Sequence, residues 1–260
     1  KKVYFEEYKE IYDDLNNKDA IACILVYPTA DIDINSQVKI KIKETCFKDE
    51  KAVIGIIGSG NFSKMVLLPV LKKINSNIKY LGSLKGLTCT HLAKKFGISY
   101  STTNYKDILL DDEIDTFIIS TRHDSHSKLV IESLKAGKNT FVEKPLAINH
   151  NQLDDVIKIY KNCKNPSLMV GFNRRFSIHL QSIKQELLDF KGPINIVANM
   201  NAGFIDSDHW VHNLEIGGGR IIGEACHLID ICVFLTGSLV KTVCMNALGN
   251  DTSLDTDNAS

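Results

Sequence analysis

A glycine-rich turn between a predicted strand and a predicted helix constrains the fold of this chain more than any other feature. Residues 52–58 read AVIGIIG, a run typical of a buried strand, and a Ser-Gly-Asn turn separates them from an apolar helix over 62–74. Gly58 permits the tight turn, and Gly60 lets a pyrophosphate approach the backbone at the helix N-terminus. Ser63 takes the third small position of G-x-G-x-x-G, so we predict a dinucleotide-binding turn rather than a plain glycine turn.

The segment around this turn alternates between predicted strands and predicted helices. Further strands are expected at 78–83, 115–121, 139–144 and 167–172, and helices at 86–96, 124–136 and 153–163. Such alternation is typical of βαβ units, whose right-handed crossovers build a doubly wound parallel sheet. We therefore predict an α/β fold with a Rossmann domain at 51–170.

The residues after this domain predict a second module of a different kind. A helix over 176–190 and a strand over 192–202 are expected to begin it, and a helix over 220–236 and a strand over 240–248 follow. Because one or two strands cannot form a stable sheet, we expect the α+β domain at 171–260 to be truncated at its C-terminus, and the chain to be a piece of a longer protein.

The residues before the Rossmann domain predict the end of another module. Apolar residues three and four apart favour a helix over 4–16, and IACILVY favours a buried strand over 21–27. Residues 29–50 are predicted to be a linker. Within it, residues 38–43 alternate cleanly, like an edge strand whose partner could also lie outside the chain.

Charge and composition narrow the range of partners. The 31 Lys and Arg residues equal the 31 Asp and Glu residues, which removes the electrostatic reason to expect nucleic acid or an anionic membrane. No apolar run approaches the roughly 18–20 residues that span a bilayer. The seven cysteines include no C-x-x-C pair, so we expect reduced thiols in a cytoplasmic protein rather than a disulfide framework or a zinc knot.

The end of the strand over 78–83 bears on the choice of nicotinamide cofactor. Domains that bind NAD place a carboxylate there for the ribose 2′-hydroxyl, but this chain reads Ser83-Leu84-Lys85. Ser83 by hydrogen bonds and Lys85 by charge could hold the 2′-phosphate of NADP. We therefore expect NAD or NADP, with a slight preference for NADP, and a solvated Lys85 without cofactor contact is the alternative.

Glu143-Lys144-Pro145 closes the strand over 139–144, at the edge where open α/β sheets bind ligands. A lysine at that edge can hydrogen-bond a substrate hydroxyl and stabilise negative charge on its oxygen. Taken alone, the motif also fits a solvated surface lysine.

Several motifs together resemble the glucose–fructose oxidoreductase and inositol dehydrogenase family, Gfo/Idh/MocA. They are the G-x-G turn, STRHDSH (120–126), EKPLA (143–147), VGFNRRF (170–176), and the run from GGG (217–219) to HLID (227–230). The resemblance covers residues 51 to about 240. It implies a tightly held nicotinamide cofactor, a substrate that is a sugar, cyclitol or nucleotide-linked sugar, and a homo-oligomer formed through the open sheet of the second domain.

The resemblance also implies roles for particular residues. It places Lys144 at the catalytic-lysine position and His227 at the position of the acid/base histidine. We expect cofactor contacts from Gly58, Gly60, Asn61, Phe62, Ser83, Lys85, Thr121, His126, Glu143 and Lys144. Substrate contacts are expected from Arg174, Arg175, His209 and Trp210.

One departure from the family pattern lies beside His227. The family often has an aspartate four residues before its histidine, where this chain has Gly223. Glu224 shares a helix face with His227 at i, i+3, so we expect this displaced carboxylate to orient the imidazole. A histidine with an ordinary pKa of about 6.5 suits proton transfer, although a histidine on an apolar helix can equally be a core residue.

The run DSDHWVH invites a metal site. Its candidate ligands are Asp206, Asp208, His209 and His212. The run lies in a predicted loop and lacks the spacing typical of zinc ligands on a helix. We therefore expect no metal.

Residues 5–28 resemble the closing helix and strand of a zinc-type medium-chain alcohol dehydrogenase, a domain that some bacterial proteins fuse ahead of this family's Rossmann domain, often among polysaccharide genes.

Taken together, the motifs predict an NAD(P)-dependent oxidoreductase acting on a CH–OH group. The alternatives are an NAD-dependent enzyme that cleaves glycosidic bonds, a non-catalytic cofactor-binding module, and a piece left inactive by its unfinished second sheet.

Overall fold

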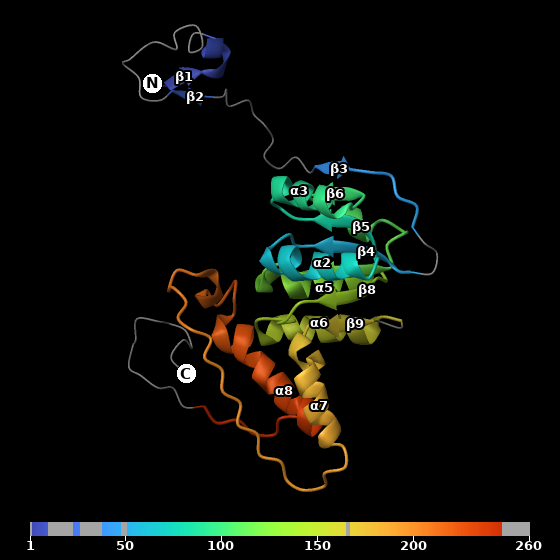
Figure 1. The fold of residues 1–260 in the computed structure, drawn as a ribbon, viewed down its shortest axis with the longest axis vertical. Coiled ribbons are helices and arrows are strands. Elements are labelled where there is room, and N and C mark those ends of the chain that lie inside the picture. The colour runs from blue at the N-terminus through green and yellow to red at the C-terminus, as the bar shows by residue number, and fades with distance from the viewer. Residues whose placement is uncertain (1, 10–22, 27–37, 48–50, 165–166, 246–260) are drawn as a thin grey trace. The chain divides into compact units, whose positions relative to one another are not determined.

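The protein is described from a computed structural model, which covers residues 2–9, 23–26, 38–47, 51–164 and 167–245 (Figure 1). The chain divides into two compact units, Lys1–Gln37 and Val38–Ser260.

The first unit contains a parallel strand pair. β1 (Lys2–Tyr4) pairs with β2 (Ile24–Val26), and the 3-10 turn η1 (Phe5–Glu7) follows β1. The strand predicted over 21–27 is confirmed in its described part, although Ile24 is 60% exposed rather than buried. Of the helix predicted over 4–16, residues 8–9 are α-helical, whereas Tyr4 ends β1 and residues 5–7 form η1. Residues 10–16 lie outside the described residues.

The second unit is built around a seven-stranded sheet in the order β3-β6-β5-β4-β7-β8-β9 (Figure 1). The strands are β3 (Lys39–Lys41), β4 (Val53–Ile57), β5 (Asn77–Gly82), β6 (Tyr100–Thr102), β7 (Thr116–Ile119), β8 (Asn139–Val142) and β9 (Leu168–Val170). All neighbouring strands are parallel except β3 and β6. The chain winds outward from β4 to β6 and then from β7 to β9, so the order reverses between β4 and β7. This confirms the doubly wound α/β fold.

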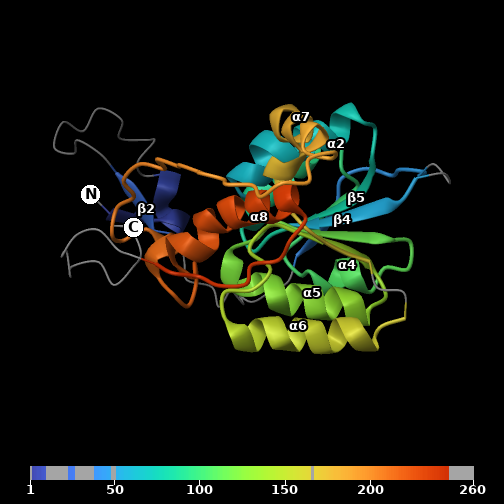
Figure 2. The same cartoon turned by 90° about the horizontal axis from the view of Figure 1, so that it is seen from below.

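Helices cover both faces of this sheet. They are α2 (Leu68–Lys73), α3 (Gly86–Phe96), α4 (Lys106–Leu109), α5 (His126–Lys135) and α6 (His150–Asn162). Figure 2 shows α2 over one face, and α4, α5 and α6 over the other. The α3 helix shares a core cluster with α2.

The strand β7 shows why both faces need a cover. Phe117 and Ile119 pack with α5 and α6, whereas Ile118 packs with α2 and α3. Successive side chains of a strand point to opposite faces, so the unbroken apolar run of β7 is buried on both sides. Such runs are typical of parallel sheets covered by helices.

Part of the predicted linker belongs to the sheet. Residues 38–47 include β3, which pairs antiparallel with β6 at the sheet edge. The Lys39 ammonium lies 4.9 Å from the Tyr80 ring centre and 5.0 Å from that of Tyr100, a cation–π arrangement. The alternation of 38–43 thus reflects an edge strand whose partner lies within this chain, and β6 and α4 are elements that the sequence patterns did not predict.

The regular elements described after β9 are all helical. They form η4 (Asn173–Phe176), α7 (Ile178–Glu186), η5 (Trp210–His212), the π-helical turn η6 (Ile221–Ala225) and α8 (Cys226–Thr236). The helices predicted over 176–190 and 220–236 are confirmed in their main parts.

The two strands predicted for this region differ from the structure. Residues 192–202 contain no strand, nor do 240–245, and residues 246–248 lie outside the described part. An extended segment becomes a strand only when a neighbour pairs with its N–H and C=O groups, and the described residues provide none here. A separate domain at 171–260 therefore stays a prediction. No helix in the described ranges is long and apolar enough to cross a membrane.

Candidate active site

The turn after β4 requires glycine at position 58. Gly58 has a φ of +112°, and a Cβ built on it would lie 2.4 Å from the main-chain oxygen of Ser120. Its N–H donates to the Gly82 carbonyl at 2.8 Å. The turn is thus clamped between the ends of β5 and β7, and only glycine combines this φ with so close an approach.

The third position of the motif uses a hydroxyl rather than a glycine. Ser63 is fully buried, its Oγ donates to the Gly58 carbonyl at 2.7 Å, and the same Oγ lies 2.7 Å from Ser120 Oγ. The serine thus ties the start of the helical segment to the turn after β4 and to the end of β7. Ser120 is therefore a supporting residue that the sequence patterns did not single out.

Gly60 differs from Gly58 because the space above it is open. Gly60 is exposed, and a Cβ built on it would meet nothing within 4 Å. Exposed Asn61 and half-buried Phe62 follow at the start of the helical segment, whose first part is the π-helical turn η2 (Ser63–Leu67). The exposed main chain at this N-terminus is the arrangement that binds a pyrophosphate.

The two glycines should therefore respond differently to alanine. Gly58→Ala is expected to lower the free energy of unfolding by more than 2 kcal/mol, as is typical when a side chain enters a filled, strained position (~1–3 kcal/mol for each effect). Gly60→Ala should leave the unfolding midpoint unchanged and weaken NADH binding. Urea unfolding and NADH titration of both variants check this, and equal stability losses would contradict it.

Ser83 and Lys85 lie where β5 leads into α3. The Lys85 N–H donates to Ser83 Oγ at 3.3 Å, and Lys85 is exposed at the uncapped N-terminus of α3. Both residues lie at the same carboxyl edge of the sheet as Gly58.

Of the two residues after β7 that were predicted to contact the cofactor, only Thr121 reaches the surface. Thr121 is half-buried, with its Oγ1 2.6 Å from Ser125 Oγ. His126 is fully buried, and its two ring nitrogens lie 2.7 Å from the Pro145 oxygen and 3.1 Å from the Thr121 oxygen. A side chain with no exposed surface cannot contact a cofactor, so His126 joins two loops instead of lining the nicotinamide side.

Lys144 follows β8 at the same edge and is half-buried. Its Nζ donates to the main-chain carbonyl of Gly223, in η6. Glu143, just before it, is half-buried beside Gly171, and burial raises the pKa of its carboxyl although the Lys144 charge acts in the opposite direction.

His227, on the first turn of α8, lies close to Lys144. Its side chain is 7% exposed, and its Nδ1 is a buried atom without a hydrogen-bond partner in the described structure. The edge of its ring faces Phe172, with 6.2 Å between centroids. Burial, then the positive charges of Lys144 and Arg174, lower the pKa of His227 to about 4. This histidine is neutral at pH 7.

The carboxylate expected to orient His227 has another partner. Glu224 Oε2 accepts from Arg220 Nε at 2.9 Å and from Nη2 at 2.8 Å. Arg220 lies one helical turn earlier and presents two parallel N–H donors. A carboxylate binds such a charged pair of donors more strongly than a single imidazole N–H. Within the described structure Glu224 makes no contact with His227 Nδ1, so the orienting role predicted for this carboxylate is not observed.

Only one of the two predicted substrate arginines has its guanidinium available. Arg175 forms a bidentate ion pair with the buried Asp230 of α8 and so holds η4 against that helix. Arg174 is exposed, and the thioether sulfur of Met200 lies 3.4 Å from its Nη1. Because a thioether is a weak acceptor, Arg174 is the better candidate to bind a polar substrate group.

Trp210 lies over the loop that follows β7. The Arg122 guanidinium is 5.5 Å from its ring centre, and the His123 ring meets it edge-on at 4.8 Å. The exposed His209 caps η5 through its Nδ1, and His212 is buried with its Nε2 3.3 Å from the Ile205 oxygen. Among the described residues, no three His, Cys, Asp or Glu side chains gather in a way that could hold a metal.

The low histidine pKa values predict a pH-dependent stability. Burial lowers the pKa of both His123 and His227 to about 4. Between about pH 6.5 and pH 4 the unfolded chain therefore binds protons that the folded protein does not, and the free energy of unfolding should fall as the pH is lowered through that window.

A His227→Asn variant should show a shallower decline, measured as the thermal unfolding midpoint from pH 7 to pH 4.5. Glu143, whose raised pKa makes the free energy of unfolding rise as the pH is lowered, is present in both proteins. The difference between their curves therefore reports the contribution of His227. Parallel curves would contradict the prediction.

The fold and the turn define the class first: an open parallel sheet with a strained glycine turn at its switch point is a dinucleotide-binding Rossmann domain. Residues 52–172 match the model described as the Gfo/Idh/MocA oxidoreductase family, NAD-binding Rossmann fold.

Relatives extend the similarity beyond the matched segment. The oxidoreductase YrbE of Bacillus subtilis is 29% identical over 203 residues, which cover 75% of this chain and 56% of that protein. The myo-inositol 2-dehydrogenase of Thermotoga maritima is 29% identical over 194 residues, covering 73% of this chain and 56% of that protein. The chain thus spans about half the length of the curated relatives it matches.

A solved structure shares the fold. The myo-inositol dehydrogenase of Lactobacillus casei, in complex with NAD(H) and myo-inositol, superposes with a TM-score of 0.60 at 19% identity. The match covers 71% of this chain and 54% of that one. At this identity the likeness shows the fold alone.

Proposed function

We propose that this chain carries the cofactor site and the catalytic pair of an NAD(P)-dependent oxidoreductase. Its substrate is a sugar, a cyclitol or a nucleotide-linked sugar, oxidised at a carbinol carbon or reduced at the corresponding ketone. The observation that carries the proposal is the placement of Lys144 beside a buried, neutral His227, at the same sheet edge as the glycine turn.

The turn fits a nicotinamide dinucleotide. The main chain at Gly60 is exposed, with open space where a Cβ would stand, so a pyrophosphate can approach the N–H groups at the start of the helical segment. Gly60, Asn61 and Phe62 would hold the pyrophosphate, and buried Gly58 would shape the turn that presents them. Thr121 and Glu143 would lie on the nicotinamide side. The cofactor supplies or accepts the hydride, whereas the protein provides position and electrostatics.

The two catalytic side chains divide the work on the substrate oxygen. Neutral His227 accepts the hydroxyl proton during oxidation and returns it during reduction. Lys144 donates a hydrogen bond to the same oxygen and stabilises its negative charge. Because the ammonium has three N–H donors, Lys144 can donate to the substrate while it keeps the Gly223 carbonyl. Arg174, His209 and Trp210 are proposed to contact the remainder of the substrate.

The experiment that tests this function is a fluorescence titration of the purified protein with NADH and with NADPH. Binding of either cofactor is expected, followed by hydride transfer with cyclitols or nucleotide-linked sugars. Absence of binding by a folded sample would refute the proposal. Substrate turnover without a net change in NADH absorbance would favour the glycoside-cleaving alternative, and binding without turnover by any variant would favour a non-catalytic module.

The titration also tests the preference for NADP. Lys85, exposed beside Ser83, is proposed to pair with the 2′-phosphate. Lys85→Ala should weaken NADPH binding about tenfold and leave NADH binding unchanged. Lys94→Ala removes an exposed lysine at the other end of α3 and is the matched control. Equal affinity of the unaltered protein for both cofactors would contradict the preference.

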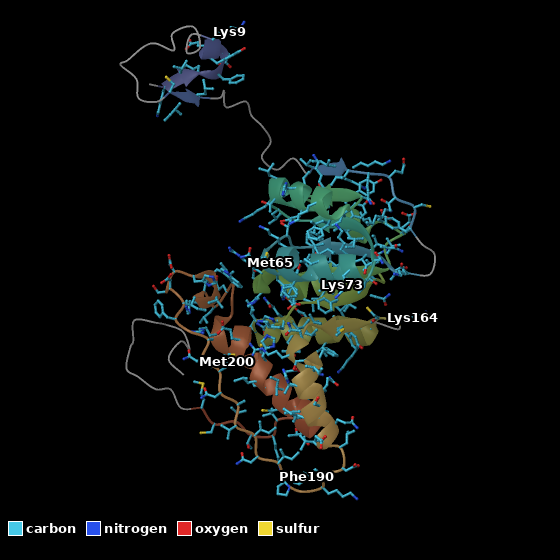
Figure 3. All side chains as sticks on the ribbon, in the orientation of Figure 1. Lys9, Met65, Lys73, Lys164, Phe190 and Met200 are labelled. Atoms are coloured by element: carbon cyan, nitrogen blue, oxygen red, sulfur yellow. The ribbon has the colours of Figure 1, made fainter. Side chains whose placement is uncertain are left out.

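A homo-oligomer formed through the region after β9 is also part of the proposal. Several large apolar side chains there are more than half exposed, including Phe190 at 54% in the loop after α7 (Figure 3), Val197, Phe204, Leu239 and Val243. Exposed apolar area of this kind is typical of an interaction surface. Sedimentation analysis tests it, and a monomer at micromolar concentration would count against it.

A further inference from the structure

His123 lies at the junction of three segments of the active site. It stands in the turn η3 (His123–Ser125), between β7 and α5, and its side chain is only 9% exposed. Its Nδ1 lies 2.8 Å from the Gly217 oxygen. Because a carbonyl can only accept, Nδ1 carries the proton of the neutral ring and donates it. The neighbouring Asp124 N–H donates to the Ile216 carbonyl at 3.0 Å, so two hydrogen bonds join this loop to residues 216–217.

The same imidazole fills the space beside Gly223. A Cβ built on Gly223 would lie 3.2 Å from His123 Cε1 and 3.5 Å from a Val211 methyl carbon. The first distance is tighter than ordinary van der Waals contact. The Trp210 ring meets His123 from another side, at 4.8 Å between centroids. The imidazole is thus held in place, and any side chain at position 223 would overlap with it.

Gly223 is also the hydrogen-bond partner of Lys144. Its carbonyl accepts the Lys144 Nζ hydrogen bond, and His227 follows four residues later in the continuous helical run of η6 and α8. Whatever fixes the Gly223 backbone therefore fixes where the Lys144 ammonium lies relative to the His227 ring.

We propose that His123 is a positioning residue of this active site: its ring, anchored by Gly217, packs against Gly223 and holds the carbonyl to which Lys144 donates. Its effect on turnover rests on the function proposed above, whereas its effect on Lys144 does not. His123 touches neither the substrate nor the cofactor in this role, and it acts through the backbone of η6.

Three variants test the packing: His123→Asn, Gly223→Ala and their combination. An asparagine amide can still donate to the Gly217 carbonyl but leaves the space beside Gly223 open. Alanine normally stabilises a helical position relative to glycine. Gly223→Ala is therefore expected to lower the thermal unfolding midpoint when His123 is present and to raise it in the His123→Asn background. A rise in both backgrounds would overturn the proposal.

A second measurement follows Lys144 itself and needs no turnover. His123→Ala should raise the rate at which acetic anhydride acetylates Lys144, measured by peptide mass spectrometry, at least threefold, because the ammonium loses its fixed acceptor. Lys138, whose Nζ donates to the Asp111 carbonyl, is the internal reference. His212→Ala, which removes another buried histidine of the same region, is the control. Unchanged Lys144 labelling in His123→Ala would overturn the proposal.

Turnover gives the third measurement. His123→Asn and Gly223→Ala are each expected to lower kcat with little change in the KM of the cofactor. The loss of kcat in the double variant should be smaller than the product of the two single losses by a factor of about five or more, as for residues in contact. If the losses of kcat in an active protein multiply strictly, the effect of His123 on turnover is overturned. If the unaltered protein binds no NADH, the proposed function fails, and the labelling and unfolding data still decide whether His123 positions Lys144.

Discussion

The His227→Asn variant is expected to lose about 10²–10⁴-fold in kcat for hydride transfer, the range typical of a lost general acid or base. Asparagine preserves much of the volume and polarity of the ring, so it leaves α8 folded, but it cannot accept a proton near neutral pH. The unaltered ring suits that step because it is neutral at pH 7.

The pH profile of the unaltered protein provides a second reading of the same residue. With a His227 pKa of about 4, the base is already neutral above roughly pH 5, so kcat/KM for oxidation should lack a limb near pH 6.5 from this group. Cys226→Ala, which changes the neighbouring residue on α8, is the matched control. An His227→Asn variant within threefold of normal turnover would exclude His227 as the acid/base group.

The Lys144→Met variant is expected to lose about 10²–10³-fold in kcat, as when one preorganised donor to a developing oxyanion is removed. Methionine keeps the unbranched side chain while removing the ammonium. Binding of NADH should stay within a few-fold of normal, because the turn at Gly58 and Gly60 is untouched. Lys144 differs from a solvated surface lysine because it is half-buried and donates to the Gly223 carbonyl.

The control for this variant is Lys135→Met, which removes an exposed lysine from the last turn of α5. It should change neither kcat nor cofactor binding. If Lys144→Met abolished NADH binding and left the fold intact, Lys144 would act on the cofactor rather than on the substrate oxygen. If it left turnover unchanged, the lysine would have no part in the reaction.

Local sequence patterns were sufficient for most strands of the sheet and for the glycine turn. The helix predicted over 86–96 has the observed bounds of α3, and the strand predicted over 115–121 contains β7. These elements are long or strongly apolar, and their periodicity follows from burial on one or both faces. The short strand β6 and the short helix α4 lack such a pattern, and they form because neighbouring strands and the core hold them.

The candidate site was predictable only in part. The motifs brought Lys144, His227 and the turn glycines to attention because each stands at a strand end or in a glycine-rich turn. His123 was part of a recognised motif, but no local pattern shows that its ring packs against a residue 100 positions later in the chain. Ser120 and the acceptor role of the Gly223 carbonyl were hidden for the same reason.

The amino-acid sequence by itself determined the alternation of strands and helices, the dinucleotide turn and the residue types available at the sheet edge. Only the tertiary structure decided which polar groups pair. Glu224 pairs with Arg220, Arg175 pairs with Asp230, and the buried His126 ring lies between the main-chain carbonyls of Pro145 and Thr121. The reason is physical: periodicity reports which face of an element is buried, whereas a hydrogen-bond partner depends on distances between segments far apart in the chain.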